Sequence, residues 1–124
     1  MLRGILALSV CAGSLFAEPA EWRIDTAHSA AQFTVRHMMV SNVRGHFGKL
    51  AGTARFDAAD PAKGSLEVTL DVASIDTREP KRDAHLKSAD FFDVEKHPTM
   101  TFKSKRIERA GSGFRLTGDL TMRG

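Results

Sequence analysis

Apolar and polar residues alternate along most of this sequence, and the alternation restricts the fold more than any other feature. The clearest run is 66–72, where every second residue is leucine or valine and Glu67, Thr69 and Asp71 stand between them. Successive side chains of a β-strand point to opposite faces of the sheet, so such a strand has one apolar and one polar face. The pattern predicts an all-β protein built from antiparallel sheet, and it disfavours a doubly wound parallel sheet.

The same alternation recurs towards both ends of the chain, in residues 21–25, 32–36 and 114–123. In residues 44–57, the phase of the alternation changes by one residue. Phe47 has an odd number, whereas the next large apolar residue, Leu50, has an even one, and Gly48 lies between them. A change of phase next to glycine predicts a β-bulge or a sharp bend, which is how a long strand turns the corner of a barrel.

One segment lacks the alternation and predicts a short helix. Residues 79–88 contain Pro80 near their start, and Thr77 just before them is a candidate helix cap. The helix would lead directly into Phe91 and Phe92. Because adjacent residues of a regular strand face opposite ways, we expect a loop or helix end that plugs one mouth of a barrel, with ordinary core packing of both rings as the alternative.

The N-terminus predicts export. Arg3 precedes an apolar run from Ile5 to Ala17, and this run is shorter than the roughly 20 residues that a membrane-spanning helix needs. A basic start, a short apolar stretch and a small residue at the cut indicate a secretory signal peptide over residues 1–17, followed by a domain over residues 18–124. We therefore expect a periplasmic protein with no transmembrane segment in the mature chain. A lipoprotein signal at Cys11 is the alternative, disfavoured by the bulky Val10 before it.

Composition narrows the function further. Removal of residues 1–17 would remove Cys11, the single cysteine of the chain, and with it disulfides, a thiolate nucleophile and cysteine-ligated metal centres. It would also remove one of the 18 basic residues, which leaves a surplus of two over the 15 acidic ones. The densest basic cluster, 103–109, has the spacing of the solvated face of a strand. The sequence therefore predicts no nucleic-acid partner.

Several blocks of the mature segment resemble the YceI family of bacterial secreted proteins. The longest block, from Arg82 to Phe102, is the most specific, because it includes the sequence Ser88-Ala-Asp90-Phe91-Phe92-Asp93. The other blocks occur in the same order as in the family and cover residues 22–29, 33–37, 43–47, 74–77 and 116–121.

This resemblance implies a lipocalin-like antiparallel β-barrel of about eight strands with one short helix, and such a barrel has room for one small ligand. It further implies a non-catalytic protein that binds or transports a polyisoprenoid or a similar isoprenoid or fatty-acyl lipid, without a cofactor. In the family pattern, residues 121–124 would be followed by further strands. We therefore expect this sequence to stop in mid-barrel. The resemblance is compatible with either a monomer or a homodimer.

The residues expected to line the ligand site are those on the inward phase of the alternation, with two more at a mouth. An apolar tail gains roughly 25 cal/mol for each Å² that it buries, and it needs few directional partners. Each of these side chains could instead belong to an ordinary core. The candidate ligand-binding residues are Phe33, Val35, Leu50, Phe56, Val68, Leu70, Met100, Phe102, Phe114 and Leu116, with Phe91 and Phe92 near the mouth.

Three histidines support an alternative function. His28, His37 and His46 are spaced nine residues apart, and a catalytic zinc ion needs three such ligands and a water molecule. Against this, no two of them have the short spacing of common zinc motifs, and we find no nucleophile elbow, carboxylate pair or phosphate loop. The sequence thus predicts no catalytic or metal-binding residues, with a metal-dependent or other enzyme that uses these histidines as the alternative.

Overall fold

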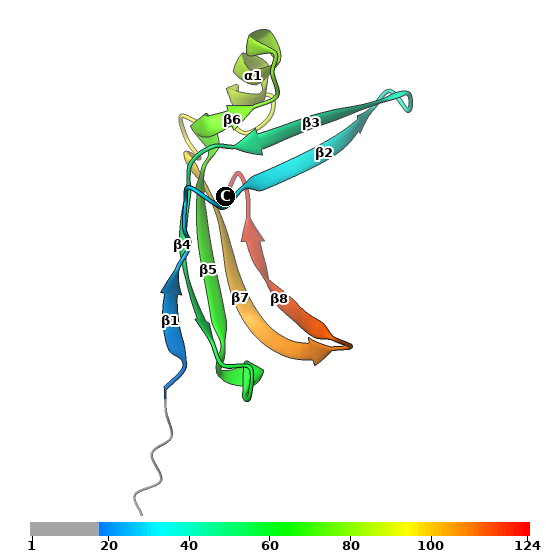
Figure 1. The fold of residues 1–124 in the computed structure, drawn as a ribbon. Coiled ribbons are helices and arrows are strands. Elements are labelled where there is room, and N and C mark those ends of the chain that lie inside the picture. Colours follow the sequence, from blue (N-terminus) through cyan, green and yellow to red (C-terminus); the bar gives the residue numbers. More distant parts are fainter. Residues whose placement is uncertain (1–17) are drawn as a thin grey trace, which may run out of the picture.

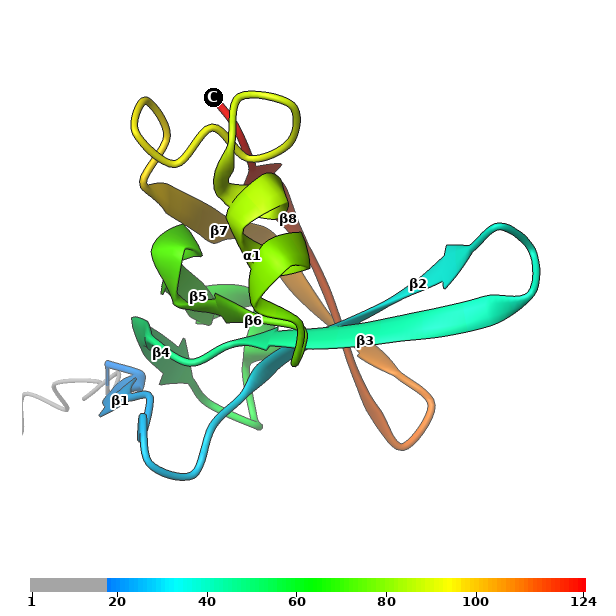
Figure 2. The same cartoon turned by 90° about the horizontal axis from the view of Figure 1, so that it is seen from above.

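The computed structural model describes residues 18–124, which form two antiparallel β-sheets and one α-helix (Figures 1 and 2). The predicted signal peptide, residues 1–17, lies outside the described residues. The antiparallel sheets and the short helix confirm the fold class that the alternation and the family resemblance predicted. The sheets do not close into a barrel within the described residues.

The larger sheet has five strands and curves strongly along its length (Figure 1). Its strands, in spatial order, are β1 (Ala20–Arg23), β4 (Leu50–Phe56), β5 (Ser65–Asp71), β7 (Thr99–Ala110) and β8 (Gly113–Thr121). A 3-10 turn, η1 (Pro61–Lys63), connects β4 to β5. The register between β7 and β8 shifts between Ser104 and Arg106, and such a bulge increases the local bend of a strand.

The smaller sheet consists of β2 (Ala31–His37), β3 (Ser41–Phe47) and the two-residue strand β6 (Ile75–Asp76), which a second 3-10 turn, η2 (Val72–Ser74), connects to β5. The β2–β3 hairpin crosses the end of the larger sheet and projects beyond it (Figures 1 and 2). Because β6 pairs only with His46 and Phe47, residues 41–45 of β3 have a strand partner on one side only.

The predicted bend joins the two sheets. Strand β3 ends at Phe47 and β4 begins at Leu50, so the chain passes from the smaller to the larger sheet at Gly48 and Lys49. The backbone N–H of Gly48 donates to the carbonyl of Ser74 over 3.2 Å, and that of Lys49 donates to the Ser74 hydroxyl over 3.0 Å. The change of phase in the sequence therefore marks a corner between sheets.

The predicted helix is present as α1 (Pro80–Lys87), but its predicted cap is wrong. The cap is Glu79, whose carboxylate accepts a hydrogen bond from the backbone N–H of Lys81 over 3.1 Å. Thr77 stands too far before the first turn to cap it. Its hydroxyl donates instead to Asp83 over 2.5 Å, and its side chain is buried.

The core lies where the two sheets and the helical segment meet. Its buried members are Phe47, Val72, Ile75 and Met100. Partly buried side chains from β2, from α1 and from the loop after α1 pack around them, namely Phe33, Leu86, Phe92 and Val94. Elements distant in the sequence are thereby fixed against one another at this end of the molecule.

The turn between β2 and β3 generates a prediction about stability. Met38 and Met39 have φ angles of 49° and 62°, and the N–H of Val40 donates to the carbonyl of His37, so two left-handed residues form the centre of a turn within the three-residue connection 38–40. Such turns favour Asn-Gly, because other side chains are strained there. Changing Met38→Asn together with Met39→Gly should raise the free energy of unfolding by about 1–2 kcal/mol, measured by chemical denaturation.

The control is Met38→Ser with Met39→Ser, which removes the same apolar side chains without supplying residues that favour the left-handed region. If the two double variants were equally stable, strain in this turn would not limit the stability of the hairpin.

Candidate functional site

The predicted lining residues of β4, β5 and β7 share one face of the larger sheet. The register places Leu50 opposite Leu70, Leu70 opposite Met100, and Val68 opposite Phe102. Cross-strand partners point to the same side of a sheet, so these side chains form one continuous apolar surface. Whether they touch a ligand stays a prediction.

The far end of this apolar surface is an aromatic contact. The rings of Phe56 and Phe114 meet edge to face with their centroids 4.8 Å apart, and the guanidinium of Arg109 lies 5.5 Å from the centre of the Phe114 ring. The backbone register places Leu116 opposite Ile107 on the same part of the sheet.

An apolar cavity of about 830 Å³, here called the apolar groove, lies at the other end, between the β2–β3 hairpin, the larger sheet and the loop after α1. Half of the predicted residues line it: Phe33, Val35, Leu70, Phe91, Phe92 and Met100. The other half lie outside it, although their strands belong to the same curved sheet: Leu50, Phe56, Val68, Phe102, Phe114 and Leu116.

Several groove residues were missed in the sequence. Three further side chains line the groove: Phe47, just before the bend, Leu86 in α1, and Met122, just after the last strand. The alternation of residues 114–123 does place Met122 on the inward face, so the sequence alone could have predicted this residue. Leu86 and Phe47 could not be assigned in the same way, because their place in the groove depends on how the helix and the bend pack.

The two adjacent phenylalanines take different positions at the mouth of the groove. The Phe92 ring packs edge to face on Phe47, with centroids 6.0 Å apart, whereas Phe91 remains 48% exposed. The Phe91 carbonyl accepts a hydrogen bond from Arg123 over 2.7 Å, and the ring meets that of His85 edge to face at 4.9 Å. One ring therefore belongs to the core and the other to the rim.

The groove opens onto an exposed apolar margin. Val35 on β2 is 55% exposed, Leu120 near the end of β8 is 60% exposed, and Met122 just after β8 is 51% exposed. Strands β2 and β8 each form one edge of their sheet within the described residues. Contiguous exposed apolar surface is uncommon on monomeric soluble proteins.

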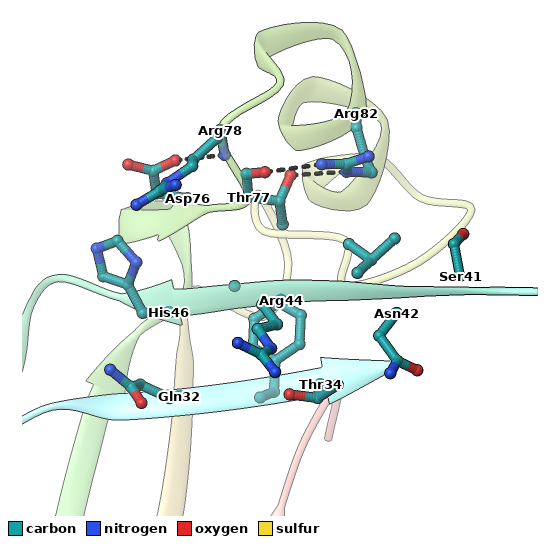
Figure 3. Close-up of a pocket in the computed structure, with 13 residues that line it drawn as sticks. Gln32, Thr34, Ser41, Asn42, Arg44, His46, Asp76, Thr77, Arg78 and Arg82 are labelled. Carbon is teal, nitrogen blue, oxygen red and sulfur yellow. Dashed lines mark hydrogen bonds between the residues drawn. The ribbon is translucent and has the colours of Figure 1, made fainter. Parts of the chain in front are cut away.

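A second cavity, of about 850 Å³, runs along β3 on the side of α1 and is here called the polar notch (Figure 3). Arg78 and Arg82 lie on its α1 side, and Arg44 lies on its β2 side (Figure 3). The remaining lining residues are Gln32, Phe33, Thr34, Ser41, Asn42, Val43, Gly45, His46, Asp76 and Thr77.

The three histidines His28, His37 and His46 do not form the alternative zinc site. His28 lies in the turn after β1, where its Nδ1 is 2.8 Å from the Asp25 carboxylate. This contact, together with the N–H of Ala27, holds the pKa of the Asp25 carboxyl below its ordinary value. In the part of the chain that the structure describes, no three side chains of His, Cys, Asp or Glu are grouped so that they could hold a metal ion.

These features define a class of protein. A strongly curved antiparallel sheet with an apolar inner face, covered at one end by a short helix and its loop, is a lipocalin-like fold. Among residues 18–124, we find no helix with both the length and the apolar character required for a transmembrane span.

The chain belongs to the YceI family, because the family's YceI-like domain matches residues 22–124. It is 35% identical to a UPF0312 protein of Pectobacterium atrosepticum and 39% identical to one of Ectopseudomonas mendocina, over 99% and 100% of this chain. It spans 65% and 68% of the length of these two relatives.

Solved structures agree with this assignment. The crystal structure of Burkholderia cenocepacia BcnA is 34% identical, with a TM-score of 0.77 over 82% of this chain and 64% of that one. The Campylobacter jejuni YCEI protein is 36% identical, with a TM-score of 0.62 over 82% of this chain and 60% of that one.

The contact between Phe33 and β3 generates a prediction. A Cβ atom on Gly45 would lie 2.3 Å from the Phe33 ring and 2.9 Å from the Thr77 methyl group. Gly45→Ala should therefore displace the ring that lines both cavities and lower the free energy of unfolding by about 1–3 kcal/mol, measured by chemical denaturation. The matched control is Gly113→Ala, because a Cβ there meets only the Ala110 carbonyl, at 3.9 Å. Equal losses of unfolding free energy in the two variants would contradict the close packing of the Phe33 ring on Gly45.

Proposed function

We propose that this protein is a non-catalytic carrier of a long apolar lipid, a polyisoprenoid or a fatty-acyl chain, that acts in the periplasm after export through residues 1–17. The observation that carries the proposal is the apolar groove, whose volume of about 830 Å³ falls in the range of small-molecule sites, about 300–1,000 Å³.

The lining of the groove suits a hydrocarbon chain. Its charged members, Asp90 and Arg123, already have partners: Asp90 contacts His85 over 2.8 Å, and Arg123 donates to the Phe91 carbonyl. Apart from Gln32, which also lines the polar notch, the remaining lining side chains are aliphatic, aromatic or thioether groups. Such a lining stabilises a ligand through buried apolar area, at roughly 25 cal/mol per Å², and offers little to a polar one.

The apolar surface beyond the groove extends the space available to a long ligand. Phe102 and Leu120 stand opposite each other, one residue pair further along the same face as Met100, and the Phe56–Phe114 contact lies at the far end. A chain that entered at the Phe91 mouth could continue along this face. The proposed carrier function includes no catalytic step, because no observation favours one.

The direct test is native mass spectrometry of the full chain purified from its own envelope fraction. We expect a bound mass that corresponds to a prenyl or acyl chain, and the same spectrum reports whether the protein is a monomer or a dimer. Protein that arrives without a lipid, and does not take up cis-parinaric acid or farnesol after purification, would contradict the carrier function.

A pair of variants tests the position of the ligand. Met122 lines the groove, whereas its neighbour Thr121 does not, and both are exposed enough to change without opening the core. Met122→Asp should weaken cis-parinaric acid binding about tenfold or more, because a charge on the groove wall would be desolvated by the acyl chain. Thr121→Asp adds the same charge outside the groove and should bind the probe as the unmodified chain does. Equal loss in both variants, measured by fluorescence titration, would show that the ligand lies elsewhere.

A further inference from the structure

The polar notch carries a concentrated positive charge that the lipid-carrier function does not use. Three arginines line it, Arg44, Arg78 and Arg82, against the single carboxylate of Asp76, which gives a formal charge of +2 with His46 neutral. The β2–β3 hairpin cannot neutralise this charge, because residues 26–56 include no Asp or Glu.

Two of these arginines are available to a ligand. Over residues 18–124, the guanidinium groups of Arg44 and Arg78 make no hydrogen bond or ion pair. Some other exposed cations are paired, as Arg55 is with Glu21 at 3.0 Å and Lys105 with Asp119 at 2.9 Å, whereas Arg36 and Arg115 make no ion pair within residues 18–124. The notch thus holds exposed donors from β3 and from the segment between β6 and α1.

The α1 side of the notch is held rigid by a hydrogen-bond network. Arg82 donates from Nε to the Thr77 hydroxyl over 2.8 Å and from Nη2 to the Thr77 carbonyl over 2.7 Å. Asp83 accepts from the N–H of Thr77 over 3.0 Å as well as from its hydroxyl. Because Thr77 is only 3% exposed, this wall is preorganised before any ligand binds.

Arg78 occupies a strained position. Its φ angle is 65°, in the left-handed region that glycine adopts at least cost, and its N–H donates to the Asp76 carboxylate over 2.8 Å. Strain of this kind is found at functional sites, where the side chain serves binding and the surrounding structure maintains the conformation. At this corner Arg78 lies on the α1 side of the notch (Figure 3).

We propose that the polar notch binds the phosphate group of a water-soluble phosphate ester that carries hydroxyl groups, such as a phosphorylated sugar or polyol. The planar guanidinium of arginine matches phosphate oxygens with two parallel hydrogen bonds. Gln32 and Asn42 offer amide donors and acceptors for the hydroxyl groups, as do the hydroxyls of Thr34 and Ser41. A volume of about 850 Å³ accommodates more than a bare phosphate ion. This site adjoins the proposed lipid groove, with which it shares Gln32 and Phe33, but its arginines belong to the notch alone and do not depend on the carrier function.

The test uses the ¹⁵N-labelled full chain titrated with glycerol 3-phosphate at constant ionic strength, with sodium chloride replaced step by step. We expect saturable shifts of the backbone amides in residues 41–46 and 76–82. Arg78→Gly should weaken binding about tenfold or more, yet its midpoint of chemical denaturation should be equal to or higher than that of the unmodified chain, because glycine relieves the strain. Arg44→Gln should weaken binding by a similar factor.

Arg115→Gln is the matched control, since Arg115 is an exposed arginine of β8 outside the notch, and it should bind as the unmodified chain does. Two results would overturn the proposal. One is the absence of saturable shifts in these two segments, or their persistence in Arg78→Gly. The other is binding to vesicles that contain phosphatidic acid without binding to glycerol 3-phosphate, which would assign the notch to a lipid head group.

Discussion

The contact between the two sheets at Phe47, Val72, Ile75 and Met100 is the interaction on which both cavities depend. Each sheet has an apolar face that it cannot bury alone, and the faces meet only at this end of the molecule. The corner at Gly48 allows the two faces to meet, because there the chain passes directly from β3 of the smaller sheet to β4 of the larger sheet. Loss of this cluster would separate the hairpin from the larger sheet and remove the walls of the groove together.

The same alternation that forms the sheets gives the β2–β3 hairpin two chemically different sides. Phe33 and Val35 face the apolar groove, with the Phe33 ring also reaching the polar notch, while Thr34 and Arg44 stand on the opposite face and border the notch. Gly45 permits this arrangement, since its missing side chain leaves room for the Phe33 ring and the Thr77 methyl group. A two-stranded ribbon can therefore separate an apolar ligand site from a cationic one.

Much of the fold could be read from the residues one segment at a time. The strands around Phe33 and Leu70, the corner beside Gly48 and the helix after Glu79 all have local signals, because each follows from the direction of neighbouring side chains or from turn chemistry. The cap was misassigned for the opposite reason. Thr77 has the residue type of a cap, but its hydroxyl is recruited by Asp83, a contact that only the packed helix creates.

The sequence alone determined the antiparallel strands, their apolar faces, the short helix and the family resemblance, since these depend on the period and order of residues along the chain. Which apolar residues form the groove was decided by the tertiary structure. Leu50 and Leu70 have the same phase and stand side by side, yet Leu70 lines the cavity and Leu50 does not. The phase of the alternation fixes the face of the sheet on which a side chain stands. A cavity depends also on what lies opposite that face. Here the β2–β3 hairpin and the loop after α1, which the corner brings back over the sheet, lie opposite Leu70.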